Sequence, residues 1–88
     1  MEFRWIDWNI QKCLKHGVDP SEVEFVVRRA RRPYPRKIED EKTLVCGQTD
    51  VGRYLQVIYL IDEDDAIFII HAMPLTPRKK RNYRRSRK

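Results

Sequence analysis

The chain has 88 residues, which is enough for one small domain, and its formal net charge is +6 at pH 7. A domain of this size buries only roughly 60–65% of the surface of its unfolded chain, so its core is modest. No apolar run approaches the roughly 20 residues that cross a bilayer, and the N-terminus has no secretory signal. We therefore expect a cytoplasmic protein that does not enter a membrane.

The positive charge is concentrated at the C-terminus. Residues 78–88 carry eight basic residues and no acidic one, whereas the other 77 residues carry eleven basic and thirteen acidic ones. The net charges of the two parts are therefore +8 and −2. Such an asymmetry is typical of a surface that meets nucleic acid or an acidic partner. A second basic cluster, RRARR, occupies residues 28–32.

The N-terminal part predicts a short strand followed by a helix. Residues 2–5, EFRW, are expected to form an edge strand. Residues 7–17 then carry apolar side chains at helical spacing, among them Cys13. Asp7 is the expected N-cap of this helix, and Gly17 is the residue that ends it.

The second predicted helix, DPSEVEFVVRRA at 19–30, has the clearer signals. Asp19 is the expected N-cap, Pro20 stands at the first helical position, and Glu22 completes a capping box. Its buried face is expected to consist of small apolar residues: Val23, Val26, Val27 and Ala30.

Beyond this helix the apolar residues recur at every second position. Residues 33–41 contain two prolines and are predicted to form a loop. The predicted strands cover 42–48, 53–61 and 66–73. Cys46 lies in the first of them and, like Cys13, is expected to be a small buried hydrophobe, although a disulfide between the two is possible. The element order predicts an α+β fold in which two N-terminal helices and a basic C-terminal helix pack on an antiparallel sheet of three to four strands.

The last predicted strand ends in a histidine. Simple alternation puts Ile67, Ile69, His71 and Met73 on one face of the sheet. At a strand end beside a basic helix, His71 is a candidate general acid or base. The alternative is a structural histidine that holds the loop 73–77 by hydrogen bonds.

The C-terminal segment predicts a capped basic helix. Thr76 is the expected N-cap, Pro77 suits the first turn, and the helix is expected to reach Tyr83. The domain is therefore assigned to 1–83, and 84–88 is assigned to a basic tail. A helical segment would present cations to phosphates while Tyr83 stacks on a base or docks the helix onto the sheet. The expected nucleic-acid-binding residues are Arg78, Lys80, Arg84 and Arg85. The alternative is a solvated tail.

No standard catalytic signature is present: the sequence has no glycine-rich phosphate loop, no zinc-ligand spacing and no Ser–His–Asp set. Arg53 begins the second predicted strand directly after a turn. An arginine in that place can hold a phosphate through two hydrogen bonds, or it can simply be a solvated turn residue.

Several stretches, in order, resemble the BrnT family of type II toxins. They are FRW and DWN at 3–9, KHGV at 15–18, GQTDVGRYLQVIYLI at 47–61, IIHAM at 69–73, and the arginine-rich end with Tyr83. The resemblance covers nearly the whole chain and rests on the order and spacing of these stretches.

This resemblance implies a RelE-like fold and an endoribonuclease that cleaves RNA and thereby inhibits translation. It also implies a bacterial toxin–antitoxin system with a BrnA-like antitoxin, which carries a DNA-binding domain and forms a hetero-oligomer with the toxin. In such ribonucleases the 2′-hydroxyl of the RNA attacks the adjacent phosphate, typically without a metal, so no cofactor or metal site is expected.

The resemblance also implies catalytic residues. Arg53 matches the arginine that follows the turn in the family, and Arg81 and Tyr83 match basic and aromatic positions of the last helix. With His71, these residues form the predicted catalytic set. Lys80 keeps a positive charge where the family usually has an arginine.

Two positions depart from the family pattern. The end of the last strand reads HAM where SAR is usual, so Met73 replaces an arginine, and Lys79 stands where a glutamate is common. Two hypotheses follow. Either His71 makes up for the lost arginine and the chain is a nuclease, or it is a non-catalytic module of the same fold that binds nucleic acid or the antitoxin.

Overall fold

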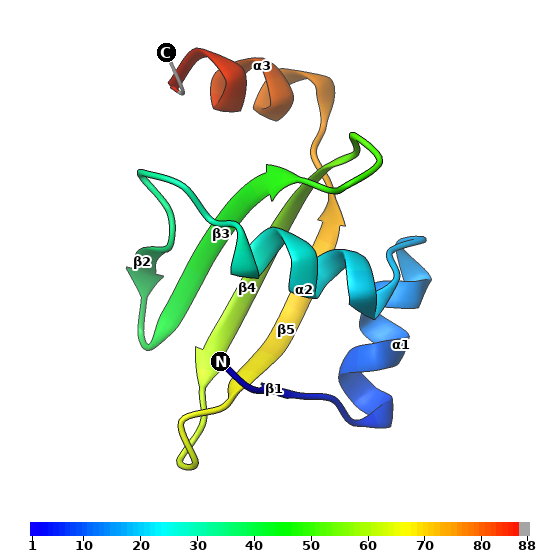
Figure 1. Cartoon of the computed structure of the whole chain (residues 1–88), viewed down its shortest axis with the longest axis vertical. Coiled ribbons are helices and arrows are strands. Elements are labelled where there is room, and N and C mark those ends of the chain that lie inside the picture. Colours follow the sequence, from blue (N-terminus) through cyan, green and yellow to red (C-terminus); the bar gives the residue numbers. More distant parts are fainter. Residues whose placement is uncertain (87–88) are drawn as a thin grey trace.

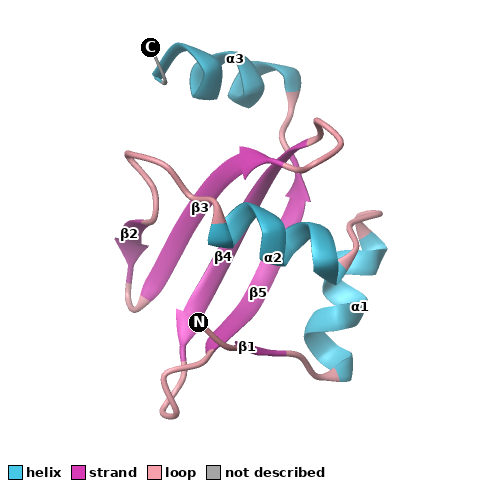
Figure 2. Ribbon diagram, viewed as in Figure 1, coloured by secondary structure: helices cyan, strands magenta, loops and turns pink. Residues whose placement is uncertain are grey.

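The computed structural model describes residues 1–86 and folds them into an α+β arrangement of three helices and a five-stranded mixed sheet (Figures 1 and 2). The elements are β1 (Phe3–Arg4), α1 (Asp7–Lys15), α2 (Pro20–Arg28), β2 (Arg36–Glu39), β3 (Lys42–Gln48), β4 (Tyr54–Ile61), β5 (Ile67–Pro74) and α3 (Pro77–Ser86). The strand order is β1-β5-β4-β3-β2. No helix within residues 1–86 combines the length and the apolar character that a membrane crossing requires.

The sheet is larger than the sequence predicted, and it is not purely antiparallel. β1 pairs in parallel with β5, while the other neighbouring strands pair antiparallel. The additional strand is β2, which pairs with β3 inside the segment that was expected to be a loop. All four of its residues are exposed, so it lacks the apolar alternation by which a strand is recognised in a sequence.

Helix α1 begins at Asp7 itself, one residue earlier than it would if Asp7 were the N-cap. Ile6 occupies the N-cap position, and its backbone N–H donates to Oδ1 of Asn9 at 2.7 Å. The Asn9 amide nitrogen donates in turn to the carbonyl of Arg4 at 2.9 Å, and Asn9 is fully buried. The prediction of Asp7 as N-cap is therefore wrong, because the capping acceptor comes from the third helical residue.

The end of α1 confirms the role of Gly17. Its φ is +70°, and its N–H donates to the Leu14 carbonyl at 2.9 Å. The N–H of Val18 donates to the Cys13 carbonyl at 3.0 Å, which completes a Schellman motif. Cys13 and Val18 are both fully buried beneath this turn.

Helix α2 follows after Asp19 and confirms the predicted capping box. The Ser21 N–H donates to Asp19 Oδ1, and the Asp19 N–H donates to Glu22 Oε1, each at 3.0 Å. Its valines are buried against β3 and β4: Val23, Val26 and Val27. A Cβ on Gly47 would lie 3.1 Å from Val26 Cγ1, so α2 rests directly on β3. The helix ends at Arg28, two residues before the predicted limit.

An irregularity in β5 changes the predicted faces of that strand. Tyr59 pairs with Ile69 and Ile58 pairs with His71, so Ile70 is an extra residue without a partner on β4. The alternation shifts at this point. His71 therefore lies on the face opposite to Ile69, which corrects the prediction that the two share a face.

The start of α3 confirms Thr76 as its N-cap, since the Lys79 N–H donates to Thr76 Oγ1 at 3.2 Å. The helix continues through Arg84 and Arg85 to Ser86, residues that the sequence assigned to a tail. Residues 87 and 88, the rest of that predicted tail, lie outside the described part. In Figure 1, α3 stands beyond the ends of the strands, apart from α1 and α2.

Candidate functional site

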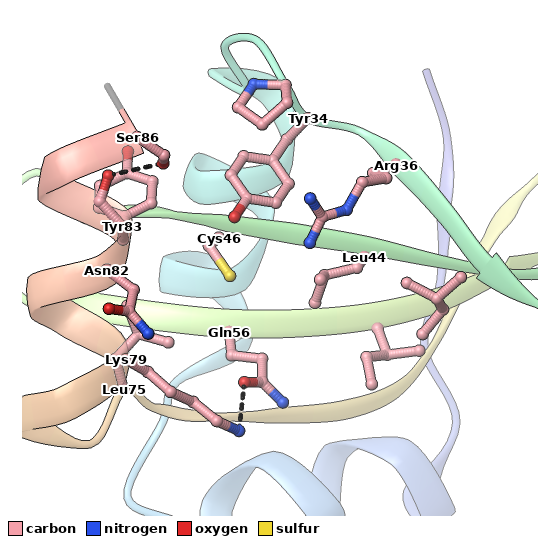
Figure 3. A pocket seen from close by; sticks show the side chains of 13 residues that line it. Tyr34, Arg36, Leu44, Cys46, Gln56, Leu75, Lys79, Asn82, Tyr83 and Ser86 are labelled. Carbon is pink, nitrogen blue, oxygen red and sulfur yellow. Dashed lines mark hydrogen bonds between the residues drawn. The ribbon is translucent and has the colours of Figure 1, made fainter. Parts of the chain in front are cut away.

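A cavity of about 440 Å³ lies between the sheet and α3, on the sheet face opposite α2 (Figure 3). Cys46 and Gln56, which pair across β3 and β4, form part of its floor. Their chain neighbours Val45 and Leu55 point to the other face and are fully buried. We call this space the sheet-face cavity. Its size is within the range of ligand sites.

The charged side chains that line the sheet-face cavity are both positive. They are Arg36, from β2, and Lys79, from α3, and no carboxylate within residues 1–86 lines the cavity. The Lys79 ammonium donates to Gln56 Oε1 at 3.2 Å, as Figure 3 shows. The Arg36 guanidinium lies 5.4 Å from the centroid of the Tyr34 ring. This arrangement suits an anionic ligand.

Tyrosine rings form the wall beneath α3. Tyr83 is the buried residue of α3, and its ring stacks on Tyr34 with the centroids 6.1 Å apart. It also meets Tyr54 edge to face at 5.8 Å. Burial, with a hydrogen bond to Cys46, raises the pKa of Tyr34 to about 12, and burial raises the pKa of the Cys46 thiol. Both groups are therefore protonated at neutral pH.

His71 does not line the sheet-face cavity but lies next to a residue that does. It pairs with Ile58, which lines the cavity, and its ring meets that of His16 from α1 with the centroids 6.0 Å apart. Burial lowers the pKa of His71 below its usual 6.5, and electrostatic repulsion from His16, Lys12 and Lys79 lowers it further. The imidazole is therefore neutral at pH 7 and able to accept a proton.

Arg53 is directed to a different part of the molecule. Its Nη1 donates to both carboxylate oxygens of Glu22, at 3.1 and 3.2 Å, and to the Gly17 carbonyl at 3.1 Å. It thus ties the turn before β4 to the start of α2. Arg53 does not line the sheet-face cavity, so the structure does not bring it together with Lys79 and Tyr83.

The basic residues of α3 that the sequence predicted as site residues lie in different environments. Arg78, Arg81 and Arg85 are exposed and line neither the sheet-face cavity nor the cavity on the other side of α3. Lys80 is half-buried, with its ammonium 4.7 Å from the centroid of the Tyr54 ring. Arg84 lines a second cavity, on the α2 side of α3.

Sequence reasoning missed most of the lining of the sheet-face cavity. Tyr34 and Arg36 belong to the segment assigned to a loop, and Gln56 was one polar residue in an apolar strand. Gln56 did carry a signal, because it interrupts the run from Tyr54 to Ile61 at a position that a structural strand would fill with an apolar residue. Lys79 was noticed only as a departure from the family pattern.

Within residues 1–86, no three His, Cys, Asp or Glu side chains lie together in a way that would hold a metal ion. Cys13 and Cys46 are both buried free thiols. Comparison of the chain with protein-family models, with curated proteins and with solved structures gave no match.

Proposed function

We propose that this chain is the toxin of a type II toxin–antitoxin pair similar to the BrnT family, a ribonuclease with a RelE-like fold that cleaves RNA in the sheet-face cavity. The observation that carries the proposal is the lining of that cavity. Arg36 and Lys79 supply positive charge, tyrosine rings supply stacking surfaces, and none of the described residues places a carboxylate in the lining.

The chemistry that these side chains suit is attack of the RNA 2′-hydroxyl on the adjacent phosphorus. A bond forms from the 2′ oxygen to phosphorus and the bond to the 5′ oxygen breaks, which leaves a 2′,3′-cyclic phosphate. The neutral His71 imidazole accepts the hydroxyl proton. The departing 5′ oxygen takes up a proton, for which the Tyr34 phenol is the candidate inside the cavity. Arg36 and Lys79 stabilise the charge on the phosphate oxygens.

The proposal includes a partner and a compartment. A BrnA-like antitoxin with a DNA-binding domain would cover the sheet-face cavity with an acidic segment, because the same cations that hold RNA attract carboxylates. The protein would act in the bacterial cytoplasm, where its RNA substrate and antitoxin are made, and would inhibit translation.

A second candidate function is RNA or antitoxin binding without cleavage. It is favoured by the position of Arg53, whose guanidinium is engaged by Glu22, and by Met73, which pairs with Gln56 where the family has an arginine. A chain that lacks both arginines at the phosphate would bind RNA and leave it intact.

The test is incubation of the purified chain with single-stranded RNA in EDTA, followed by analysis of the product ends. We expect fragments that end in a 2′,3′-cyclic phosphate. Substitution of Arg36→Gln or Lys79→Gln is expected to lower kcat/KM about 10²–10³-fold, the usual effect of removing one group that stabilises a developing negative charge.

The matched control is Lys37→Gln, which removes one positive charge from the residue next to Arg36 but lines a different cavity. We expect its kcat/KM to stay close to that of the wild type. Intact RNA, together with normal growth after induced expression, would remove the nuclease proposal. Binding of RNA in that same experiment would leave the second candidate. Rescue of a toxic phenotype by the neighbouring open reading frame would identify the antitoxin.

A further inference from the structure

A second cavity, of about 460 Å³, lies on the other side of α3, between that helix, the end of α2 and the end of β3. Three arginines from two separate parts of the chain line it: Arg29 and Arg31, which follow α2, and Arg84 of α3. No carboxylate of the described part of the chain lines it. We call this space the arginine cavity. It includes two of the four arginines of the basic cluster at 28–32.

The three guanidinium groups are available to a ligand. Within residues 1–86 none of them forms an ion pair, whereas Arg28 pairs with Glu24 at 3.6 Å and Arg53 pairs with Glu22. The Arg29 guanidinium lies 4.6 Å from the centroid of the Phe25 ring, a stacking contact that holds it over the cavity wall. Unpaired guanidinium groups gathered without a counter-charge repel one another, which favours an external anion.

The arginine cavity and the sheet-face cavity share part of their lining. Cys46 and Tyr83 line both of them, so the two spaces lie on either side of the Tyr83 ring. Phe25 and Tyr54 add aromatic surface to the arginine cavity. Arginines interleaved with aromatic rings suit a strand in which phosphates alternate with bases, whereas an acidic peptide has no need of the stacking surfaces.

We propose that the arginine cavity binds the phosphodiester backbone of a single-stranded RNA, one or more nucleotides away from the segment held in the sheet-face cavity. The strand would cross α3, with its reacting phosphate near Arg36 and Lys79 and its flanking phosphates near Arg29, Arg31 and Arg84. This inference rests on the proposed function for the identity of the strand as RNA.

The test measures binding of a fluorescent 2′-O-methyl RNA of about ten nucleotides as a function of salt, because such an RNA lacks the attacking hydroxyl and spans a typical single-strand site. The variant replaces all three arginines: Arg29→Gln, Arg31→Gln and Arg84→Gln. If each arginine neutralises one phosphate, the slope of log K against log salt concentration falls by about 2, since each phosphate contributes about 0.7. Near 0.15 M salt this is roughly 50-fold weaker binding.

The matched control removes three positive charges elsewhere: Lys15→Gln, Arg32→Gln and Lys37→Gln. All three side chains are exposed and none lines either cavity. We expect a much smaller change of slope. The substituted side chains of both variants are exposed, so both should keep the unfolding transition of the wild type. Equal losses in the two variants would overturn the inference, because they would show that only net charge matters.

The remaining outcomes separate this inference from the proposed function. A wild-type chain that cleaves RNA, beside an arginine variant that binds and cleaves normally, would keep the nuclease and overturn the arginine site. A wild-type chain that leaves RNA intact, beside a variant with the expected loss of slope, would keep the arginine site and overturn the nuclease proposal. An arginine variant that keeps RNA binding but loses an acidic antitoxin peptide would assign the arginine cavity to a protein partner and overturn the inference.

Discussion

Helices α2 and α3 are nearly equal in length but are held in the fold in opposite ways. Helix α2 packs three buried valines on the sheet and has its N-terminus closed by a capping box. Helix α3 contributes one buried side chain, that of Tyr83, and carries six cations. A helix that buries an apolar face fills the space beside it, whereas a helix held by one ring leaves room for ligands on both sides. Helix α2 therefore contributes mainly to the core, whereas α3 contributes mainly to the lining of the two cavities.

The largest expected effect on stability comes from the face of α2. Val23→Ala removes two methyl groups from a fully buried site, and we expect the free energy of unfolding to fall by about 2–3 kcal/mol. Urea unfolding measures it. Val51→Ala, at a position 75% exposed, is the control and should change the value by no more than about 0.5 kcal/mol. Equal effects at the two positions would contradict the packing described for α2.

The corresponding change in α3 is Tyr83→Ala. It removes the ring contacts with Tyr34 and Tyr54, each worth about 0.5–1.5 kcal/mol, so we expect the free energy of unfolding to fall by about 1–3 kcal/mol. Because α3 would detach while the sheet stays folded, its amide protons should exchange rapidly and those of α2 should keep their protection. Hydrogen exchange measures both. Equal loss of protection in the two helices would show that α3 is part of the cooperative core.

The two N-caps allow a matched comparison of smaller size. Asp19→Ala removes a cap from a packed helix, and we expect a loss of about 1 kcal/mol in the free energy of unfolding. Thr76→Ala removes a cap from α3, which barely contributes to the core. We expect urea unfolding to change by less than about 0.5 kcal/mol, while the helical circular dichroism of the native chain decreases. Equal losses in the free energy of unfolding from the two cap substitutions would contradict the difference described between α2 and α3.

The smallest expected effect is a dependence of stability on pH. The folded state lowers the pKa of His71 below 6.5, chiefly by burial and then through electrostatic repulsion from His16, Lys12 and Lys79. Above pH 6.5 the imidazole of His71 is mainly neutral in both states, and titration of this group does not lower the free energy of unfolding. As the pH falls below 6.5, the unfolded chain takes up the proton first, and the stability is lost as the pH passes through the folded pKa.

The measurement for this last prediction is urea unfolding at several pH values between about 7.5 and 5.5. We expect His71→Gln to give a flatter profile than the wild type in this window. A wild-type profile that rises as the pH is lowered would contradict the direction of the shift.

Local signals explain which elements were predictable. Asp19, Pro20 and Glu22 lie within four residues of one another and specify the start of α2 without help from the rest of the chain. Thr76 and Pro77 do the same for α3. The three long strands were predictable because each alternates or is apolar over seven or eight residues.

Pairing between distant segments explains what was missed. β2 is a strand only because β3 lies beside it, and its own residues carry no pattern. The extra residue Ile70 moves His71 to the cavity side, and a count of alternate residues along β5 alone cannot locate such a shift. Arg53 meets a carboxylate 31 positions earlier in the chain, so its sequence neighbours gave no sign of the ion pair.

The candidate site was only half predictable for the same reason. The basic, aromatic character of α3 was evident, and docking of the helix was one of the two roles considered for Tyr83, whose ring contacts Tyr34 and Tyr54. The opposite wall of the sheet-face cavity comes from a segment that follows α2 and from the middle of two strands. These segments meet only through the order of strands in the sheet.

The position of β2 also bears on how the protein behaves at high concentration. β2 is the last strand of the sheet, so one row of its backbone N–H and C=O groups has no neighbouring strand. Such an edge invites pairing with another chain and the growth of aggregates. Here the edge is only four residues long, and three of them are charged: Arg36, Lys37 and Glu39. The polarity that concealed this strand in the sequence is therefore what protects the sheet from edge-to-edge aggregation.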